Sequence, residues 1–251
     1  MIKEGLYEDY EKQQDLLKLI RFNTTKSKEN KKSLEDYIKA KQEKQKSIYY
    51  ITSEDYESAI ANPILEGFKS RDIEVIIFTD PVDSFWTAAK LEYEKMEFKH
   101  VSHTQDELKD IPIKNQDKKN SKSIKINDAA MAEIKTRILK VLKEDVSDVK
   151  PNLALHESPA CLSLSENSYD KTLQKILQEK QGIEVSKPVF EFNPSHKIID
   201  LLSKKIQGKK LKEVNILIQL LYDYALIMDG EKPKDIARFG VNLQEILTKS
   251  K

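Results

Sequence analysis

One segment near the end of the chain constrains the fold more than any other, because it is apolar on almost every side. Residues 211–228 have the pattern of a helix, and their apolar side chains leave only a narrow polar line, Asn215, Gln219 and Asp223, spaced by four. A surface helix needs only one apolar stripe, so this helix must be covered on most of its circumference. A second helix is predicted at 233–248, again with apolar residues at helical spacing.

Two such helices at one end of a chain favour self-association. Gly240 in the second helix permits close approach of another helix, at some cost in helix propensity. We expect the helical hairpin to pair with a second copy in a four-helix bundle. The predicted dimer interface consists of Leu217, Leu220, Leu221, Tyr224, Ala225, Met228, Ile236, Phe239, Gly240, Leu243, Ile246 and Leu247. The alternative is that both helices pack only on their own domain.

The first hundred or so residues alternate predicted helices and strands. Helices are expected at 7–20, after the serine N-caps Ser33 and Ser53, and after residues 80–83 in a segment containing Phe85 and Trp86. Continuous apolar strands are expected at 48–52 and 74–79. Apolar strands separated by helices predict an α/β fold, here a small α/β/α sandwich unit with a mainly parallel sheet.

A strongly polar stretch divides the chain. Residues 114–122 contain no apolar side chain, so they cannot build a core, and we interpret 113–126 as a linker. The predicted domains are 1–112 and 127–251. The second is predicted to be α+β, ending in the helical hairpin; its further helices are expected around 131–142, at 166–181 and from 193, and its strands at 151–155, 160–164 and 188–192.

The composition argues against several classes of protein. The 43 basic and 42 acidic side chains nearly cancel, so net charge gives no reason to expect binding to nucleic acid or to a membrane surface. No apolar run approaches the roughly 20 residues of a membrane helix, and the first residues do not have the pattern of a signal peptide. A single cysteine, Cys161, fits a reducing compartment, so we expect a cytoplasmic protein.

The chemistry-bearing residues do not form a recognisable catalytic pattern. His100 and His103 have helical spacing, but no cysteine or carboxylate pattern completes a metal site around them. Cys161 lies in an apolar strand pattern, which favours a buried structural thiol. The six glycines form no phosphate-binding loop, and the turn after the first strand, at 52–55, is acidic. We therefore expect no catalytic residue, metal or nucleotide site in this chain.

The predicted helix at 166–181 carries a stripe of four apolar residues. They are Tyr169, Leu173, Ile176 and Leu177. By its spacing alone, such a stripe is typical of a helix face that packs on a core.

Several longer motifs occur together in one order. They are SLEDY at 33–37, IYYIT at 48–52, NPILE at 62–66, EVIIFTDPVD at 74–83, SPAC at 158–161, KPVFEFNPSH at 187–196 and LLYDYAL at 220–226. In order and spacing they resemble the end of the middle domain and the C-terminal domain of the heat shock protein 90 family, in its bacterial branch. The resemblance covers nearly the whole chain and is weakest at 109–127.

This resemblance implies a part of an ATP-driven, homodimeric chaperone. The nucleotide domain, which binds ATP and magnesium in the full-length protein, would lie upstream of Met1, so this part would not itself be an enzyme. The family's C-terminal domain projects an amphipathic helix towards partly unfolded client proteins, and the stripe of Tyr169, Leu173, Ile176 and Leu177 falls on that helix. Phe85 and Trp86 match a position where the middle domain offers an aromatic contact to clients.

Two other functions remain open from the sequence. The first is a small α/β enzyme with its own nucleotide or catalytic site and a dimerisation tail. The second is a structural dimerisation module that makes no contact with clients. Nucleotide binding would distinguish the enzyme from the chaperone part.

Overall fold

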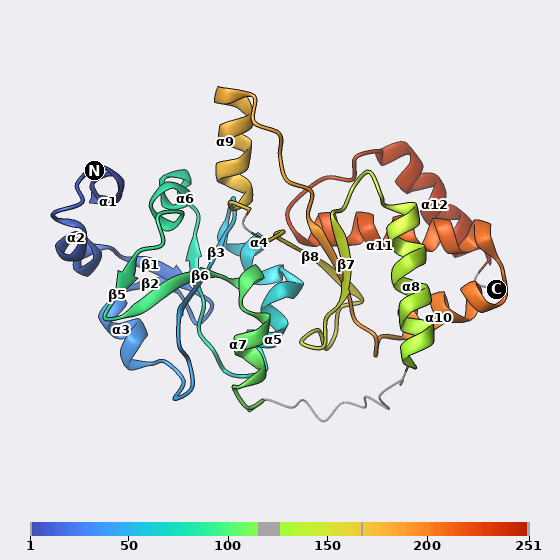
Figure 1. Cartoon of the computed structure of the whole chain (residues 1–251), viewed down its shortest axis with the longest axis horizontal. Coiled ribbons are helices and arrows are strands. Elements are labelled where there is room, and N and C mark those ends of the chain that lie inside the picture. The colour runs from blue at the N-terminus through green and yellow to red at the C-terminus, as the bar shows by residue number, and fades with distance from the viewer. Residues whose placement is uncertain (1, 115–125, 167, 250–251) are drawn as a thin grey trace. The chain divides into compact units, whose positions relative to one another are not determined.

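The computed structural model of the chain describes residues 2–114, 126–166 and 168–249 (Figure 1). By their contacts the described residues form two compact units. Unit 1 comprises 2–61, 67–114, 166 and 168–186, and unit 2 comprises 62–66, 126–165 and 187–249. This division differs from the predicted one at 62–66, which belongs to unit 2, and at 166–186, where α9 packs on α6 of unit 1. Residues 115–125, most of the predicted linker, lie outside the described residues.

Unit 1 is built on a mixed six-stranded sheet with the order β2-β1-β4-β3-β6-β5. The strands are β1 (Phe22–Thr24), β2 (Ser27–Lys32), β3 (Ile48–Thr52), β4 (Ile76–Phe78), β5 (Glu92–Tyr93) and β6 (Met96–His100). Only the β3–β4 and β3–β6 pairs are parallel; β1–β2, β1–β4 and β5–β6 are antiparallel. The prediction of a mainly parallel sheet is therefore wrong, because two hairpins add antiparallel strands to a parallel centre.

The helices near this sheet follow the predicted signals in part. They are α1 (Ile2–Glu8), α2 (Gln13–Leu19), α3 (Leu34–Lys39), α4 (Tyr56–Ala61), α5 (Glu66–Lys69), α6 (Pro81–Thr87), α7 (Gln105–Lys109) and α9 (Lys171–Gln181), with a short 3₁₀ turn at Val101–His103. A second 3₁₀ turn, Pro63–Leu65, belongs to unit 2. Ser33 caps α3 in a capping box with Asp36, as predicted. The predicted helix at 7–20 is instead two helices, and Asp55 rather than Ser53 accepts the hydrogen bond from Ser58 N at the start of α4.

Aromatic side chains fill the core of unit 1. Trp86 is fully buried and packs edge-on against Phe78 and Phe98, with ring centroids 5.2 Å apart in both cases. The Trp86 indole Nε1 donates a hydrogen bond to Asp83 (2.9 Å), so its polar atom has a partner inside the core. These contacts fix α6 on the sheet and leave Phe85, on the neighbouring position, half-buried.

Unit 2 combines a three-stranded sheet with four helices. The strands β7 (Asp148–Pro151), β9 (Val189–Phe192) and β8 (Ala160–Ser163) lie in that order, with β7 parallel and β8 antiparallel to β9. The helices are α8 (Asp128–Val141), α10 (Lys197–Gln207), α11 (Leu211–Met228) and α12 (Ile236–Lys249). The bounds of α11 agree with the prediction. The first strand precedes the predicted 151–155, and α10 begins only after its N-cap, His196.

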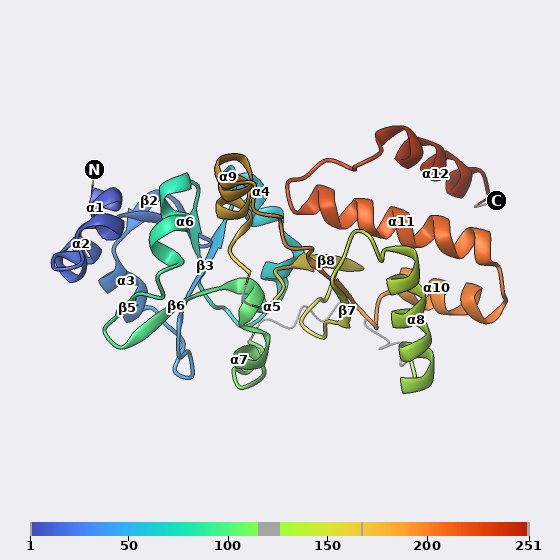
Figure 2. The same cartoon turned by 45° about the horizontal axis from the view of Figure 1, so that its top comes forward.

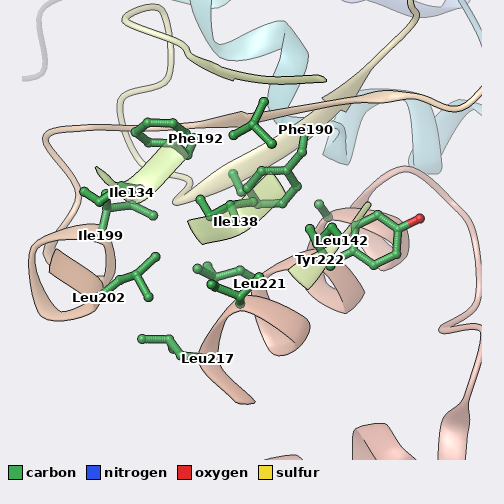
Figure 3. Close-up of a cluster of buried hydrophobic side chains, with 14 of the residues drawn as sticks. Ile134, Ile138, Leu142, Phe190, Phe192, Ile199, Leu202, Leu217, Leu221 and Tyr222 are labelled. Atoms are coloured by element: carbon green, nitrogen blue, oxygen red, sulfur yellow. The ribbon is translucent and has the colours of Figure 1, made fainter. Parts of the chain in front are cut away.

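The core of unit 2 is formed by the sheet together with α8, α10 and α11. Figure 3 shows Phe190 and Phe192 of β9 facing Ile134 and Ile138 of α8, with Leu221 of α11 in the same cluster. The pattern of residues 211–228 required most of the circumference of α11 to be covered. Most of this cover comes from the same chain.

Candidate functional site

An apolar stripe on α12 faces away from its own unit. Ile236 and Leu247 are each 64% exposed, and Leu243 is 40% exposed. Positions 236, 240, 243 and 247 are separated by four, three and four residues, so they lie on one face of the helix. At Gly240, in the middle of this face, no described residue other than its helix neighbours comes within 4 Å of the place where a side chain would begin. We call Ile236, Gly240, Leu243 and Leu247 the α12 stripe; it extends for about 17 Å along the helix.

The inner face of α12 is polar. Arg238, Asn242 and Glu245 lie on the side opposite to the α12 stripe, and they meet Asp223, Gln219 and Lys212 of the neighbouring α11, respectively. The atoms concerned are Arg238 Nη2 and Asp223 Oδ1 (3.8 Å), Asn242 Nδ2 and Gln219 Oε1 (3.2 Å), and Lys212 Nζ and Glu245 Oε1 (3.1 Å). We call these three contacts the polar ladder. The two helices run side by side and antiparallel (Figure 2).

The orientation of α12 is the reverse of that of an ordinary surface helix. Such a helix places its apolar stripe on the core and its polar residues in solvent. Here Arg238, Asn242 and Glu245 face α11, whereas the α12 stripe faces away from it, on the same side as the exposed Gln244. The third residue of the polar line on α11, Asn215, is also met by a polar side chain, since it accepts a hydrogen bond from Arg137 of α8.

The predicted interface residues divide into three groups by their exposure. Those open to solvent are Ile236, Leu243 and Leu247, and the half-buried ones are Leu220, Tyr224, Met228, Phe239, Gly240 and Ile246. The other three, Leu217, Leu221 and Ala225, are 8%, 4% and 1% exposed within a single chain. These three belong to the core of unit 2, as Figure 3 shows for Leu217 and Leu221, so assigning them to an interface needs correction.

Helix α9 is held on unit 1 at its N-terminal end. Asp170 is its N-cap, and the carboxylate accepts hydrogen bonds from Thr172 N (2.9 Å), Leu173 N (3.1 Å) and Ser84 Oγ (2.9 Å). Burial raises the pKa of Asp170, although these hydrogen bonds act in the opposite direction. The helix ends at Gly182, which has the left-handed φ of +66° that favours glycine in a C-cap.

The predicted client-contact residues are likewise not equivalent. Tyr169 is 51% exposed, and Ile176, Leu177 and Phe85 are half-buried. Leu173 is only 5% exposed and Trp86 is fully buried. Leu173 faces inward because Asp170 anchors that turn of α9, and Trp86 is enclosed by Phe78 and Phe98. Neither is on the surface, so both are corrected to core residues.

Some exposed apolar residues were not found from the sequence. Ile183 and Val185, 47% and 37% exposed, follow α9 in a segment without regular structure. Tyr7 of α1 is 51% exposed and its ring lies 5.7 Å from that of Phe85. The alternation of Ile183 and Val185 was a possible signal, whereas nothing near Tyr7 in the sequence points to Phe85.

The titratable residues considered for catalysis are mostly enclosed. Burial lowers the pKa of His100 to about 3, and its ring centroid lies 6.3 Å from that of His103. Cys161 is 1% exposed, and burial, followed by the nearby Glu191, raises the pKa of its thiol. Within the described ranges, no three histidine, cysteine or carboxylate side chains are grouped so as to hold a metal ion. In the same ranges, none of the helices has the length and apolar character needed to cross a bilayer.

Two compact units that expose apolar side chains on either side of α9 in the sequence and on α12 are typical of a protein that binds other proteins. A sequence model of the Hsp90 protein family matches residues 1–251, and the chain belongs to this family of chaperones. The resemblance noted in the sequence is thereby confirmed at the level of the family.

Curated relatives agree with this assignment. The chaperone protein HtpG of Mesorhizobium japonicum is 36% identical over 252 residues, covering 99% of this chain and 39% of the relative. The HtpG proteins of Rhizobium meliloti and Ehrlichia canis are 37% and 32% identical, over 98% and 99% of this chain. The chain spans about two fifths of the length of these relatives, 39–40%.

Proposed function

We propose that this chain is the self-association and client-contact part of an ATP-dependent chaperone of the HtpG type, comprising the end of the middle domain and the C-terminal domain. The observation that carries the proposal is the orientation of α12, with its polar side inside and its apolar stripe outside. A second copy that presents the same stripe would cover it, and α11 and α12 of both copies would form a four-helix bundle.

The dimer part of the proposal rests on exposed and half-buried residues only. They are Leu220, Tyr224 and Met228 of α11 together with Ile236, Phe239, Gly240, Leu243, Ile246 and Leu247 of α12. A twofold interface uses the same patch on both copies, so each of these residues is counted twice in the association. Because glycine has no side chain, Gly240 supports close contact between helices, and among the described residues no other segment occupies the space beside it.

Sedimentation equilibrium over a dilution series tests this interface with matched variants. Leu243→Asp places a carboxylate in the α12 stripe, whereas Gln244→Asp places the same charge on the next, exposed position. Leu243→Asp removes the apolar surface of Leu243 that is exposed in one chain and would be buried in the dimer, so the association loses about 1 kcal/mol per copy. Burying a carboxylate in its place costs at least about 1–3 kcal/mol more. Because both copies carry the change, we expect the Kd to rise by at least about 100-fold.

Gln244→Asp should leave the Kd within a few fold of wild type. If Leu243→Asp and wild type have the same mass at every concentration, the α12 stripe is not the interface. Leu217→Asp serves as a second control: it should lower the melting temperature, since Leu217 is in the core of unit 2.

Client contact is supported by separate observations on unit 1. Asp170, the N-cap of α9, accepts a hydrogen bond from Ser84, the neighbour of Phe85, so the exposed Tyr169 and the first turn of α9 lie close to the Tyr7–Phe85 pair. We propose that Phe85, Tyr169, Ile176 and Leu177 contact partly unfolded client proteins. Exposed apolar patches of this kind mark sites of interaction.

We propose no binding site for ATP or magnesium in this chain. We assign nucleotide chemistry to the remainder of the full-length protein, and we place the protein in the cytoplasm with a reduced, unpaired Cys161. No nucleic acid or membrane partner is proposed, since the 43 basic and 42 acidic side chains leave a net charge of only +1.

A further inference from the structure

The polar ladder contains a carboxylate that is unusually costly to bury. Asp223 is fully enclosed, and neither of its side-chain oxygens accepts a hydrogen bond from any described residue. The Arg238 Nε is buried without a hydrogen-bond partner in the same described ranges, and Arg238 Nη2 is 3.8 Å from Asp223. Asn242, the next member of the ladder, is 7% exposed.

These contacts are poorly explained by stability alone. Asp223 is fully enclosed, whereas the Arg238 side chain is 38% exposed; taking the carboxylate out of water costs free energy that a cation 3.8 Å away recovers only in part. Replacement of such a pair by apolar side chains is often neutral or stabilising. Apolar side chains at positions 223 and 238 would therefore hold α12 on α11 about as well as Asp223 and Arg238 do. We look for a role of the charged pair other than stability.

That role is to fix the rotation of α12 about its own axis. The α12 stripe lies on the side of the helix opposite to Arg238 and Asn242. If α12 turned by half a revolution, Leu243 and its neighbours would pack on α11 and escape from water. The same rotation would bury Asp223 and Gln219 against leucine and isoleucine, without any polar partner, which is strongly unfavourable.

A shift of α12 along α11 is opposed for the same reason. Moving α12 by one turn, so that Asn242 faced Asp223, would place Ile246 against Gln219. Buried polar residues are known to fix the register of paired helices in this manner, at a cost in stability. The ladder therefore disfavours both the rotated and the shifted arrangement.

We propose that Asp223 and Arg238, supported by Gln219 and Asn242, prevent α12 from burying its apolar stripe within its own chain and so reserve the stripe for a second copy. The inference rests on the proposed self-association. Since every chain presents the stripe with the same rotation, the surfaces of two copies match in a twofold arrangement. In this role Asp223 and Arg238 are positioning residues, which need not contact the partner.

The test compares two double variants of the full 251-residue chain. Asp223→Leu with Arg238→Met makes the ladder apolar at its centre. Asp223→Asn with Arg238→Gln keeps a polar pair and is the conservative control. Each is measured for melting temperature, for Kd by sedimentation equilibrium and for the distance between two copies.

The distance is measured by pulsed electron resonance between spin labels on Ala237→Cys. Ala237 is exposed on α12 outside the stripe, and the native Cys161 is buried, so the label reacts at position 237 alone. For the wild-type ladder we expect one narrow distance. For the apolar pair we expect an unchanged or higher melting temperature, a broad distance distribution, and a Kd raised at least about 10-fold, because most molecules then have the stripe turned inward. The amide pair should retain the narrow distance.

Other outcomes separate the two proposals. If the labelled wild-type chain is a monomer at all concentrations, self-association through α12 is wrong and this inference falls with it. If the wild type is a dimer that Leu243→Asp dissociates, but the apolar pair keeps the same Kd and distance, only the role of the ladder is refuted. A lower melting temperature with an unchanged dimer would show that Asp223 and Arg238 serve stability instead.

Discussion

Phe85 and Trp86 are neighbours in the sequence, and the structure gives them opposite roles. The sequence resemblance led us to expect client contact at both, but Trp86 is fully buried whereas Phe85 is half-buried. We therefore predict that Trp86→Ala impairs folding and that Phe85→Ala impairs client protection. The two changes are chemically alike, so the comparison isolates the effect of burial.

The magnitude for Trp86 follows from its contacts. Truncation of a buried tryptophan to alanine costs about 3–5 kcal/mol, because a cavity remains. The lost hydrogen bond from Trp86 Nε1 to Asp83 adds about 1 kcal/mol. The sum is about 4–6 kcal/mol, so for a unit of this size the melting temperature of unit 1 should fall by roughly 15–30 °C.

Phe85→Ala removes a smaller buried surface. Half-buried, with the Tyr7 ring on one side, Phe85 should contribute about 1–2 kcal/mol to the stability of unit 1. Its main effect is expected on the suppression of light scattering when a chemically unfolded protein is diluted into buffer containing the chain. Tyr10→Ala, which removes a ring that is 74% exposed and outside the proposed contact surface, is the control and should protect like wild type.

Thermal unfolding and the scattering assay together decide between the two roles. The reasoning is refuted if Trp86→Ala melts like wild type, since a core tryptophan cannot be removed without cost. It is equally refuted if Phe85→Ala protects the unfolded protein as well as the Tyr10→Ala control does.

Three further predictions follow from the same structure. On α9, Leu173→Ser should lower the melting temperature more than Ile176→Ser does, because Leu173 is 5% exposed and Ile176 is half-buried. Ile176→Ser should in addition lose client protection. The reverse order of melting temperatures would place Ile176 in the core. For Glu107, burial raises the pKa, but hydrogen bonds from Lys99 Nζ (2.5 Å) and Tyr49 Oη (2.8 Å) outweigh it and the net shift is downward from 4.5. The ionised form of Glu107 therefore stabilises the fold at pH values above about 4.5. By urea unfolding at pH 7, Glu107→Gln should be about 1–3 kcal/mol less stable than wild type, and this difference should shrink as the pH falls through the lowered pKa. A difference that stays constant at all pH values would contradict this. Finally, the purified chain should show no saturable ATP binding by titration calorimetry, and binding that a substitution in this chain abolishes would revive the enzyme hypothesis.

Several local features could be predicted because they depend on neighbouring residues. The capping box of Ser33 and Asp36 and the C-cap at Gly182 are of this kind, whereas the bounds of α11 followed from its apolar pattern. A helix start or end is determined by side chains within one turn of it, so the printed residues suffice. The membership in the Hsp90 family was also accessible, because it depends on the order of long motifs.

The strands at the edges of unit 1 could not be predicted. The β5–β6 hairpin turns at Glu94 and Lys95, which both have the positive φ of a tight hairpin turn, 50° and 65°. Neither residue is a usual turn signal, so the sequence gives no indication of the hairpin. The antiparallel β1–β4 pairing joins segments about 50 residues apart, for which local patterns carry no information.

Tertiary structure decided which apolar residues are available to a partner. In the sequence, Leu217 and Leu243, or Leu173 and Ile176, have equivalent positions on amphipathic helices. Periodicity shows that a helix has an apolar face but not what covers that face. For Leu217 and Leu173 the cover is the chain's own core. For Leu243 the polar ladder turns the stripe outward, and that depends on Asp223 of α11 meeting Arg238 of α12, a contact that exists only once the two helices have packed.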